Sequence, residues 1–196
     1  MASSVNRVAA PSITNECVWD GLAQSLRRVT VQIFGRGGNH GARIVWRSDG
    51  MIVTNAHVVR GTSMIRLEDG RTHRAELVAQ DHRLDLAILR IPVRALVGAQ
   101  RRDSTLRTGE VVVAVGHPLG DIGAVSFGIV HAAPSRHLIE ADIRLLPGNS
   151  GGPLADASGR VVGINCMVAN GMAVAVSTAA IERFLQKHLG SEEWTA

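Results

Sequence analysis

The chain of 196 residues is 45% hydrophobic and 19% charged, with a formal net charge of +4. This composition excludes a disordered chain, and no apolar run approaches the roughly 18–20 residues needed to span a bilayer. The basic residues are scattered arginines and no aromatic cluster offers a base-stacking surface, so we expect no nucleic-acid partner. Cys17 and Cys166 are too few for a disulfide scaffold and too far apart in sequence to suggest a metal site, so we expect no metal and no cofactor.

The first elements expected along the chain are a flexible tail over residues 1–14 and a short amphipathic helix over about residues 16–27. Val18, Leu22 and Leu26 share one face of that helix. From residue 29 onward apolar and polar residues alternate, which is typical of half-buried strands. The predicted strands, in chain order, are VTVQIF, ARIVWR, MIVT, the two arms of a hairpin around Asp69-Gly70, LAILRI, EVVVAV, AVSFGIV, HLIEADI, RVVGINCMV and MAVAVS.

A second helix is predicted near residues 178–189, with Ser177 or Thr178 as its N-cap and Gly190 at its end. Its apolar stripe consists of Ile181, Phe184, Leu185 and Leu189. Residues 191–196 are expected to form a C-terminal tail. The many short strands separated by turn residues predict an all-β barrel or sandwich rather than βαβ units, and no linker divides the chain.

The stretch PGNSGGPL, residues 147–154, places Ser150 among glycines. Gly, Asn, Ser and Pro are turn residues, so a polar surface turn is one interpretation. The other is a catalytic serine whose neighbouring backbone N–H groups are bare and stabilise an oxyanion. A serine hydroxyl is a weak nucleophile until a base takes its proton, and the base works best when a buried carboxylate orients it.

His57 and Asp85 are the candidate base and acid. His57 directly follows an apolar strand in MIVTNAHVVRG, and Asp85 opens the strongly apolar strand LAILRI. Burying an unpaired carboxylate costs several kcal/mol, so Asp85 needs a partner. The order His57, Asp85, Ser150 argues against the G-x-S-x-G elbow of α/β-hydrolases, which requires a helix after the serine and a catalytic histidine downstream. Residues 151–153, GGP, prevent that helix, and the only later histidine is His188 in the terminal helix.

The motifs TNAHVV, DLAILRI and PGNSGGPL, in this order, resemble the protease domain of the HtrA family of trypsin-like serine proteases. SDGMIVTN, VVVAVGHPLG and GRVVGIN support the match, which covers about residues 20–188. The resemblance implies an all-β, two-barrel chymotrypsin/trypsin-like fold with short N- and C-terminal helices. The protease domain is then expected over residues 15–190, with barrel halves at about 15–100 and 101–190 and the active site between them.

By the same resemblance His57 is the general base, Asp85 the acid that orients it, and Ser150 the nucleophile. The backbone N–H groups of Gly148 and Ser150 are implied to form the oxyanion hole. The substrate-binding residues implied by position are Leu145, Cys166, Met167, Val168 and Val174. Their apolar side chains predict a preference for Val, Ala, Leu or Met before the cut bond, and rejection of charged residues.

Three positions depart from the family pattern. Arg43 stands in GAR where family members usually read glycine-serine-glycine, and Leu146 stands where they usually have asparagine. Cys166 replaces a small hydroxyl residue that usually helps to hold the triad aspartate, and a thiol is the weaker hydrogen-bond partner. The PDZ module that usually follows this domain in the family is not recognisable in the sequence.

The resemblance implies a serine endopeptidase that cleaves unfolded or misfolded proteins through an acyl-enzyme intermediate. Two alternatives stay open, namely a catalytically silent binding or chaperone-like domain and a small-ester hydrolase. The family commonly forms trimers through its N-terminal segment, where this chain offers Trp19, so a homotrimer is an expectation. We expect a cytoplasmic protein if Met1 is the natural start, and a cell-envelope or periplasmic one if a signal peptide has been removed.

Overall fold

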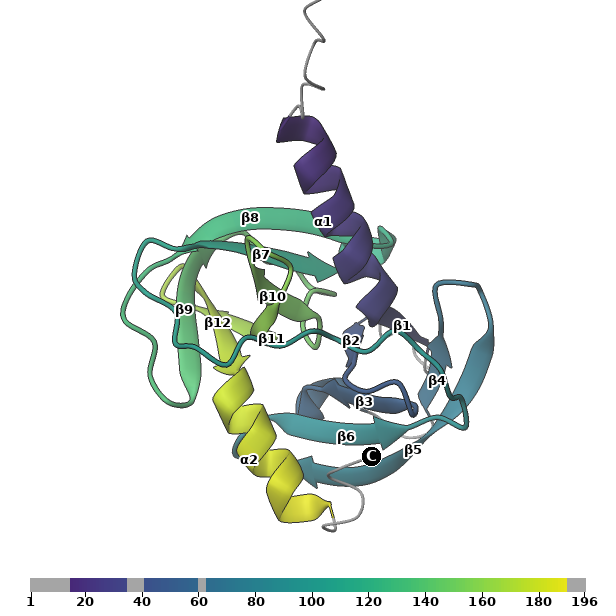
Figure 1. Ribbon diagram of the computed structural model, residues 1–196. Helices are drawn as coiled ribbons and strands as arrows, with labels where there is room; N and C mark the ends of the chain where they lie inside the picture. The colour runs from purple at the N-terminus through teal and green to yellow at the C-terminus, as the bar shows by residue number, and fades with distance from the viewer. Residues whose placement is uncertain (1–14, 35–40, 60–62, 190–196) are drawn as a thin grey trace, which may run out of the picture.

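The structure, a computed structural model, describes residues 15–34, 41–59 and 63–189. In these ranges twelve strands form two closed six-stranded barrels, and one helix precedes and another follows the strands (Figure 1). The all-β, two-barrel fold expected from the sequence is confirmed. The two expected tails and Gly190 lie outside the described residues.

The first barrel has the strand order β1-β2-β3-β6-β5-β4, and neighbouring strands are antiparallel. Its strands are β1 (Thr30–Phe34), β2 (Ala42–Val45), β3 (Met51–Thr54), β4 (Ser63–Arg66), β5 (Thr72–Asp81) and β6 (Leu86–Arg90). Thr54 at the end of β3 pairs with Ala87 at the start of β6. This register brings the segments that carry His57 and Asp85 side by side.

The second barrel has the order β10-β11-β12-β9-β8-β7, again with antiparallel neighbours. Its strands are β7 (Val111–Gly116), β8 (Ala124–Val130), β9 (Leu138–Ile143), β10 (Pro153–Asp156), β11 (Val161–Ala169) and β12 (Met172–Ser177). The PGNSGGPL stretch joins β9 to β10, so Ser150 lies on a connection at one end of this barrel.

Strand β10 was not among the strands predicted from the sequence. It has four residues, all buried, so the alternation that marks a half-buried strand is absent. It also begins at Pro153, which has no N–H to donate and is a turn residue in sequence-based prediction. The strand nevertheless pairs with both β7 and β11 and closes the barrel.

The two helices each contact both barrels. Helix α1 (Asn15–Val29) packs against β1 and β7, and helix α2 (Thr178–His188) packs against β6, β11 and β12 (Figure 1). On α1, Leu22 and Leu26 are buried as expected, whereas Val18 is 51% exposed. The predicted stripe of α2 is confirmed, because all of its members are buried: Ile181, Phe184, Leu185 and Leu189.

The N-cap of α2 is Ser177. Its hydroxyl oxygen accepts a hydrogen bond from the N–H of Ala180 at 3.2 Å and donates one to the carbonyl of Arg136 at 3.0 Å. Thr178 is the first residue of the helix. The sequence left these two candidates open, and the hydrogen bonds select Ser177.

The barrels share a hydrophobic core that continues under α2. Its members come from the first barrel, the second barrel and the helix, and include Ile44, Trp46, Val53, Leu86, Ile88, Val161, Ile164, Val176, Ile181, Phe184 and Leu185. Burying such side chains stabilises a fold by about 1.5–3 kcal/mol each. The two halves are therefore packed as one body, and the loops at their junction keep a fixed separation.

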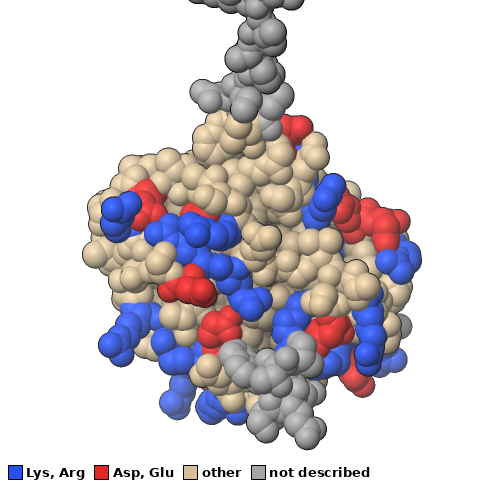
Figure 2. Space-filling model, in the orientation of Figure 1, with Lys and Arg blue, Asp and Glu red and all other residues tan. Residues whose placement is uncertain are grey.

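Charged side chains of both signs are interspersed over the face in Figure 2. Among the described residues, an exposed ion pair joins Arg71 to Asp69 at 2.6 Å. Exposed ion pairs of this kind contribute only about 0–1 kcal/mol each. In the described ranges, no helix has the length and apolar character needed to span a bilayer.

Candidate active site

His57 lies three residues beyond β3, in a 3-10 turn over Ala56–Val58. The flanking residues Ala56 and Val58 are buried, while the His57 side chain is 50% exposed. The buried neighbours anchor the turn against the first barrel. The imidazole ring therefore faces solvent on a rigid support.

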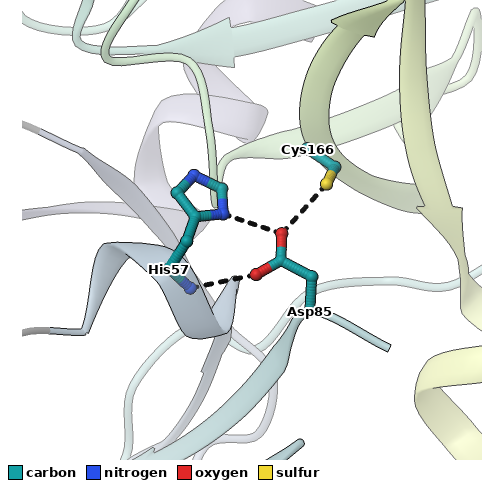
Figure 3. A group of neighbouring side chains, drawn as sticks. All are labelled: His57, Asp85 and Cys166. Carbon is teal, nitrogen blue, oxygen red and sulfur yellow. Dashed lines mark hydrogen bonds and ion pairs between the residues drawn. The ribbon is translucent and has the colours of Figure 1, made fainter. Parts of the chain in front are cut away.

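Asp85 precedes β6 and its carboxylate accepts three hydrogen bonds (Figure 3). Oδ1 accepts from the backbone N–H of His57 at 2.9 Å, and Oδ2 lies 2.7 Å from Nδ1 of the same residue. The thiol of Cys166, on β11, donates to Oδ2 at 3.0 Å. The Asn55 side chain also donates to the Asp85 carbonyl at 3.1 Å. The acid is held from both barrels.

These bonds determine the protonation of the site. Burial would raise the pKa of Asp85, but the hydrogen bonds from His57 and Cys166 outweigh it and hold that pKa below its ordinary value. Asp85 is therefore ionised at neutral pH and can only accept hydrogen bonds. It follows that Nδ1 of His57 carries a proton, so in the neutral ring Nε2 is free to accept another.

Cys166 is a buried, protonated thiol. Burial raises the pKa of the Cys166 thiol, and the hydrogen bond to the negative Asp85 raises it further, to about 12. The sequence suggested a looser hold on Asp85 because a thiol is a weak donor. The structure retains the contact that a hydroxyl would make at this position.

The turn that carries Ser150 requires its glycines. Gly148 has a φ of +108° and Gly151 a φ of +83°, in the left-handed region that favours glycine. A Cβ at Gly148 would lie 2.4 Å from the carbonyl oxygen of His117, and one at Gly151 would lie 2.1 Å from that of Ala42. The turn therefore packs its backbone against both barrels at once.

The hydroxyl of Ser150 donates to the carbonyl of Cys166 at 3.0 Å. Among the described residues, no hydrogen bond joins this hydroxyl to His57. The structure thus brings His57 and Asp85 together directly, and connects Ser150 to that pair through Cys166. The carbonyl of Cys166 accepts the hydrogen bond from the serine hydroxyl, while its thiol donates one to Asp85.

The peptide between Pro147 and Gly148 has a fixed orientation. The carbonyl of Pro147 accepts a hydrogen bond from Leu119 at 3.2 Å, and the carbonyl of Gly148 accepts one from His117 at 3.1 Å. In a trans peptide the N–H points opposite to the C=O, so the Gly148 N–H is directed away from Leu119. Within the described part of the chain, the N–H groups of Gly148 and Ser150 have no hydrogen-bond acceptor.

A hollow of about 390 Å³ opens beside Ser150. It is lined by Leu145, Leu146, Pro147, Asn149, Ser150, Met167 and Val168. Three of the expected substrate-binding residues are among them, while Cys166 and Val174 are buried and do not line it.

The lining residues Leu146, Pro147 and Asn149 were not predicted from the sequence, although their position just before Ser150 is a usable signal. Arg144 is exposed and is not part of the lining, which carries no charged side chain.

Strand β2 links the two halves of the site. The N–H of Ala42 donates to the carbonyl of Ser150 at 3.1 Å, and Nη2 of Arg43 donates to the carbonyl of Val58 at 3.3 Å. Arg43 is fully buried, and burial lowers the pKa of its guanidinium to about 9. Its Nε and Nη1 have no partner in the described part of the chain. The sequence marked Arg43 only as a departure from the family pattern.

Two closed barrels with a histidine–aspartate pair and a glycine-framed serine where they meet define a chymotrypsin-like architecture. The family of trypsin-like peptidase domains matches residues 41–164. A probable periplasmic serine endoprotease, DegP-like, from Marinomonas sp. is 40% identical over 68% of this chain and 31% of its own length. The mitochondrial serine protease HTRA2 of Drosophila pseudoobscura pseudoobscura is 37% identical over 76% of this chain and 39% of its own. Human serine protease HTRA4 is 31% identical over 96% and 41%.

Solved structures agree with these relatives. The serine endoprotease from Yersinia pestis superposes with a TM-score of 0.81 at 27% identity, over 89% of this chain and 68% of that one. The HtrA-type protease AlgW with a tripeptide gives 0.79 at 26%, over 89% and 64%. The chain belongs to the trypsin-like peptidase family and is an HtrA-type protease domain. It spans between 31% and 41% of the length of the three relatives described above.

The buried thiol gives a prediction that needs no substrate. With a pKa of about 12, on the order of one Cys166 in 10⁴ is a thiolate at pH 8, so alkylation by iodoacetamide should be at least ~10³-fold slower in the folded protein than in urea. Asp85→Asn removes the neighbouring charge, lowers the Cys166 pKa and should speed the native reaction. Peptide mass spectrometry after timed quenching measures both rates. Equal alkylation rates in the folded and unfolded protein would contradict the assignment of Cys166 as a buried, protonated thiol.

Proposed function

We propose that this protein is a serine endopeptidase that cleaves polypeptides through a His57–Asp85–Ser150 triad and an acyl-enzyme. Ser150 Oγ attacks the peptide carbonyl carbon while its proton passes to Nε2 of His57. The protonated ring then gives that proton to the leaving amine, and water hydrolyses the ester by the same steps. Asp85 keeps Nδ1 protonated and stabilises the charged ring. The observation that carries the proposal is the 2.7 Å contact between Nδ1 and Oδ2, which leaves Nε2 as the acceptor.

The N–H groups of Gly148 and Ser150 are proposed to bind the oxyanion of the tetrahedral intermediate. Both lack an acceptor in the described part of the chain, and the Leu119 contact orients the first of them. Removing one such donor typically costs about 2.7–4 kcal/mol of transition-state stabilisation. Two bare N–H groups on one tight turn are the arrangement that this chemistry requires.

The orientation of Ser150 favours one alternative, a domain that binds chains without cutting them. Its hydroxyl donates a hydrogen bond to the carbonyl of Cys166 rather than to His57. Breaking a neutral hydrogen bond of this kind costs only about 0.5–1.5 kcal/mol net, and rotation about χ1 moves the oxygen between staggered positions. Such a cost slows a reaction by about tenfold or less, so the resting orientation does not oppose the enzymatic proposal.

Unfolded or misfolded proteins are the proposed substrates, because the apolar hollow beside Ser150 accepts side chains that folded proteins bury. Two of the relatives are named as periplasmic or mitochondrial proteases, so we propose a location outside the cytoplasm, and the cytoplasmic alternative has no support from them. A homotrimer remains an expectation from the family.

The proposal is tested by a serine-directed fluorophosphonate probe. Wild-type protein should be labelled at Ser150, as located by peptide mass spectrometry, because the reaction needs both the nucleophile and the oxyanion donors. Ser150→Ala should give no adduct and should lose casein cleavage by a factor on the order of 10⁴ to 10⁶. Wild-type protein that is never labelled, in the presence or absence of unfolded protein, would favour the binding alternative.

A second test separates two nearby acids. Asp85→Asn should reduce kcat/KM by roughly 10⁴, because an amide lets His57 take the wrong tautomer. Asp81 accepts from the N–H groups of Arg83 and Leu84 at 2.8 and 3.0 Å within its own turn. An asparagine oxygen accepts the same bonds, so Asp81→Asn should cost less than about tenfold. Comparable losses, or the reverse order, would mean that Asp85 has been given the wrong role.

The third test concerns the bond that is cut. The hollow has an uncharged lining, and a buried ammonium or carboxylate left unpaired there costs several kcal/mol. Cuts in a denatured protein should therefore follow Val, Ala, Leu or Met, with mild discrimination among them, since a methylene is worth about 1–3 kcal/mol. Terminal sequencing of the products by mass spectrometry gives the distribution. A majority of cuts after Lys or Arg would exclude this hollow as the specificity pocket.

A further inference from the structure

The side chains of His57, Asp85 and Cys166 form a cluster of three different metal-ligand types. One ligand atom from each, a ring nitrogen, a carboxylate oxygen and Sγ, lies within 4.8 Å of the other two (Figure 3). Imidazole nitrogen, carboxylate oxygen and thiolate sulfur are the ligands that Zn²⁺ uses in proteins. The sequence did not suggest a metal site, because the three residues are far apart along the chain.

We propose that this cluster binds a zinc ion, with water as a fourth ligand, and that the bound ion switches off the triad. The binding depends only on the three side chains. The inhibition rests on the proposed function, because it acts through the base that the protease needs.

The proton balance of binding is simple. In the resting site, a proton on Nδ1 and a proton on Sγ both lie between their own atom and Oδ2 of Asp85. Zn²⁺ takes the place of both. The thiol proton is released to solvent, and the ring exchanges its Nδ1 proton for one on Nε2. The site changes from a net charge of −1 to 0 as one Zn²⁺ enters and one proton leaves.

The spacing of the three ligand atoms must change before they can share one zinc ion. Tetrahedral zinc with bonds of about 2.0 Å to nitrogen or oxygen and 2.3 Å to sulfur holds its ligands roughly 3.3–3.6 Å apart. Oδ2 lies 2.7 Å from Nδ1 and 3.0 Å from Sγ, so it must withdraw by some tenths of an ångström. The ring nitrogen and Sγ, which lie within 4.8 Å of each other, must approach by as much as about 1.3 Å. Oδ1 keeps its bond to the His57 N–H during this shift, and Asn55 still anchors the Asp85 backbone. Such supporting contacts orient metal ligands elsewhere.

Solvent reaches the site from the His57 side. The side chains of His57 and Asp85 are 50% and 20% exposed, while Cys166 is only 5% exposed. An incoming metal ion can therefore bind the more exposed His57 and Asp85 first, and the buried Cys166 sulfur afterwards. This order of contacts supplies the entry path that a metal site requires.

The bound ion blocks the base without touching Ser150. With zinc on Nδ1, the remaining ring proton lies on Nε2, which can no longer accept a proton from the serine hydroxyl. The thiolate is the decisive ligand, because a serine at position 166 would hold Asp85 through a hydroxyl that zinc binds far more weakly. Metal sensitivity would then be a property of this cysteine rather than of the triad alone.

Cobalt provides the first test, because Co²⁺ occupies zinc sites and gives a near-ultraviolet charge-transfer band when a thiolate binds it. Titration of the purified full chain with Co²⁺ should produce this band at one ion per chain. Cys166→Ser should abolish the band, while Cys17→Ser and His131→Ala, an exposed histidine outside the cluster, should retain it. No band in the wild type, or a band that survives Cys166→Ser, would overturn the site.

Zinc itself provides the second test. Saturating Zn²⁺ should lower wild-type cleavage at least tenfold, with recovery on adding EDTA. Cys166→Ser should need at least tenfold more zinc for half inhibition, each variant being compared with its own metal-free rate. Equal sensitivity of the two proteins would overturn the proposed inhibition.

A third measurement uses only the wild type, in case Cys166→Ser does not fold. X-ray absorption at the zinc edge should show one sulfur at about 2.3 Å and nitrogen or oxygen at about 2.0 Å. A shell of nitrogen and oxygen alone would overturn the site. If the protein proves to have no protease activity, the cobalt and absorption results still decide whether zinc binds, so failure of the proposed function is distinguishable from failure of the site.

Discussion

The carboxylate of Asp85 is the point on which the site depends. It is partly buried, and a partly buried charge is tolerated only when donors surround it. Its donors are the backbone and ring of His57 in the first barrel and the thiol of Cys166 in the second. Placing this one acid therefore requires the β3–β6 register, the 3-10 turn after β3 and the position of β11 to be correct together. The His57 backbone and ring both donate hydrogen bonds to this carboxylate, so the position of His57 follows from that of Asp85.

Strand β2 performs the complementary task for the serine. Ala42 donates a hydrogen bond to the backbone of Ser150, and Arg43 donates one to the backbone of Val58, next to His57. A fully buried arginine that makes one hydrogen bond within the described residues is costly, and hydrophobic replacements of buried charges are often neutral or stabilising. The fold accommodates this charge one residue away from the Ala42 contact with Ser150.

Much of the fold was accessible from the sequence, because half-buried strands alternate and turns use a small set of residues. The alternation failed at β10, where burial on both faces removes it. The sequence could propose His57, Asp85 and Ser150 as candidates because each stands at the end of an apolar strand or in a glycine-rich turn. The hydroxyl orientation of Ser150, the burial of Val174 and the closeness of Cys166 to Asp85 were not accessible. They depend on how the two barrels pack against each other, and such packing produces no regular pattern of apolar and polar residues in the sequence.

The helices at the two ends of the described chain have a consequence for how the molecule comes apart. Each one lies on both barrels, so neither barrel can unfold without exposing apolar surface of a helix that the other still needs. Two barrels joined only by a linker would melt separately. Here the terminal helices couple them into one cooperative unit, so His57, Asp85 and Ser150 should lose their arrangement in the same transition rather than one after another.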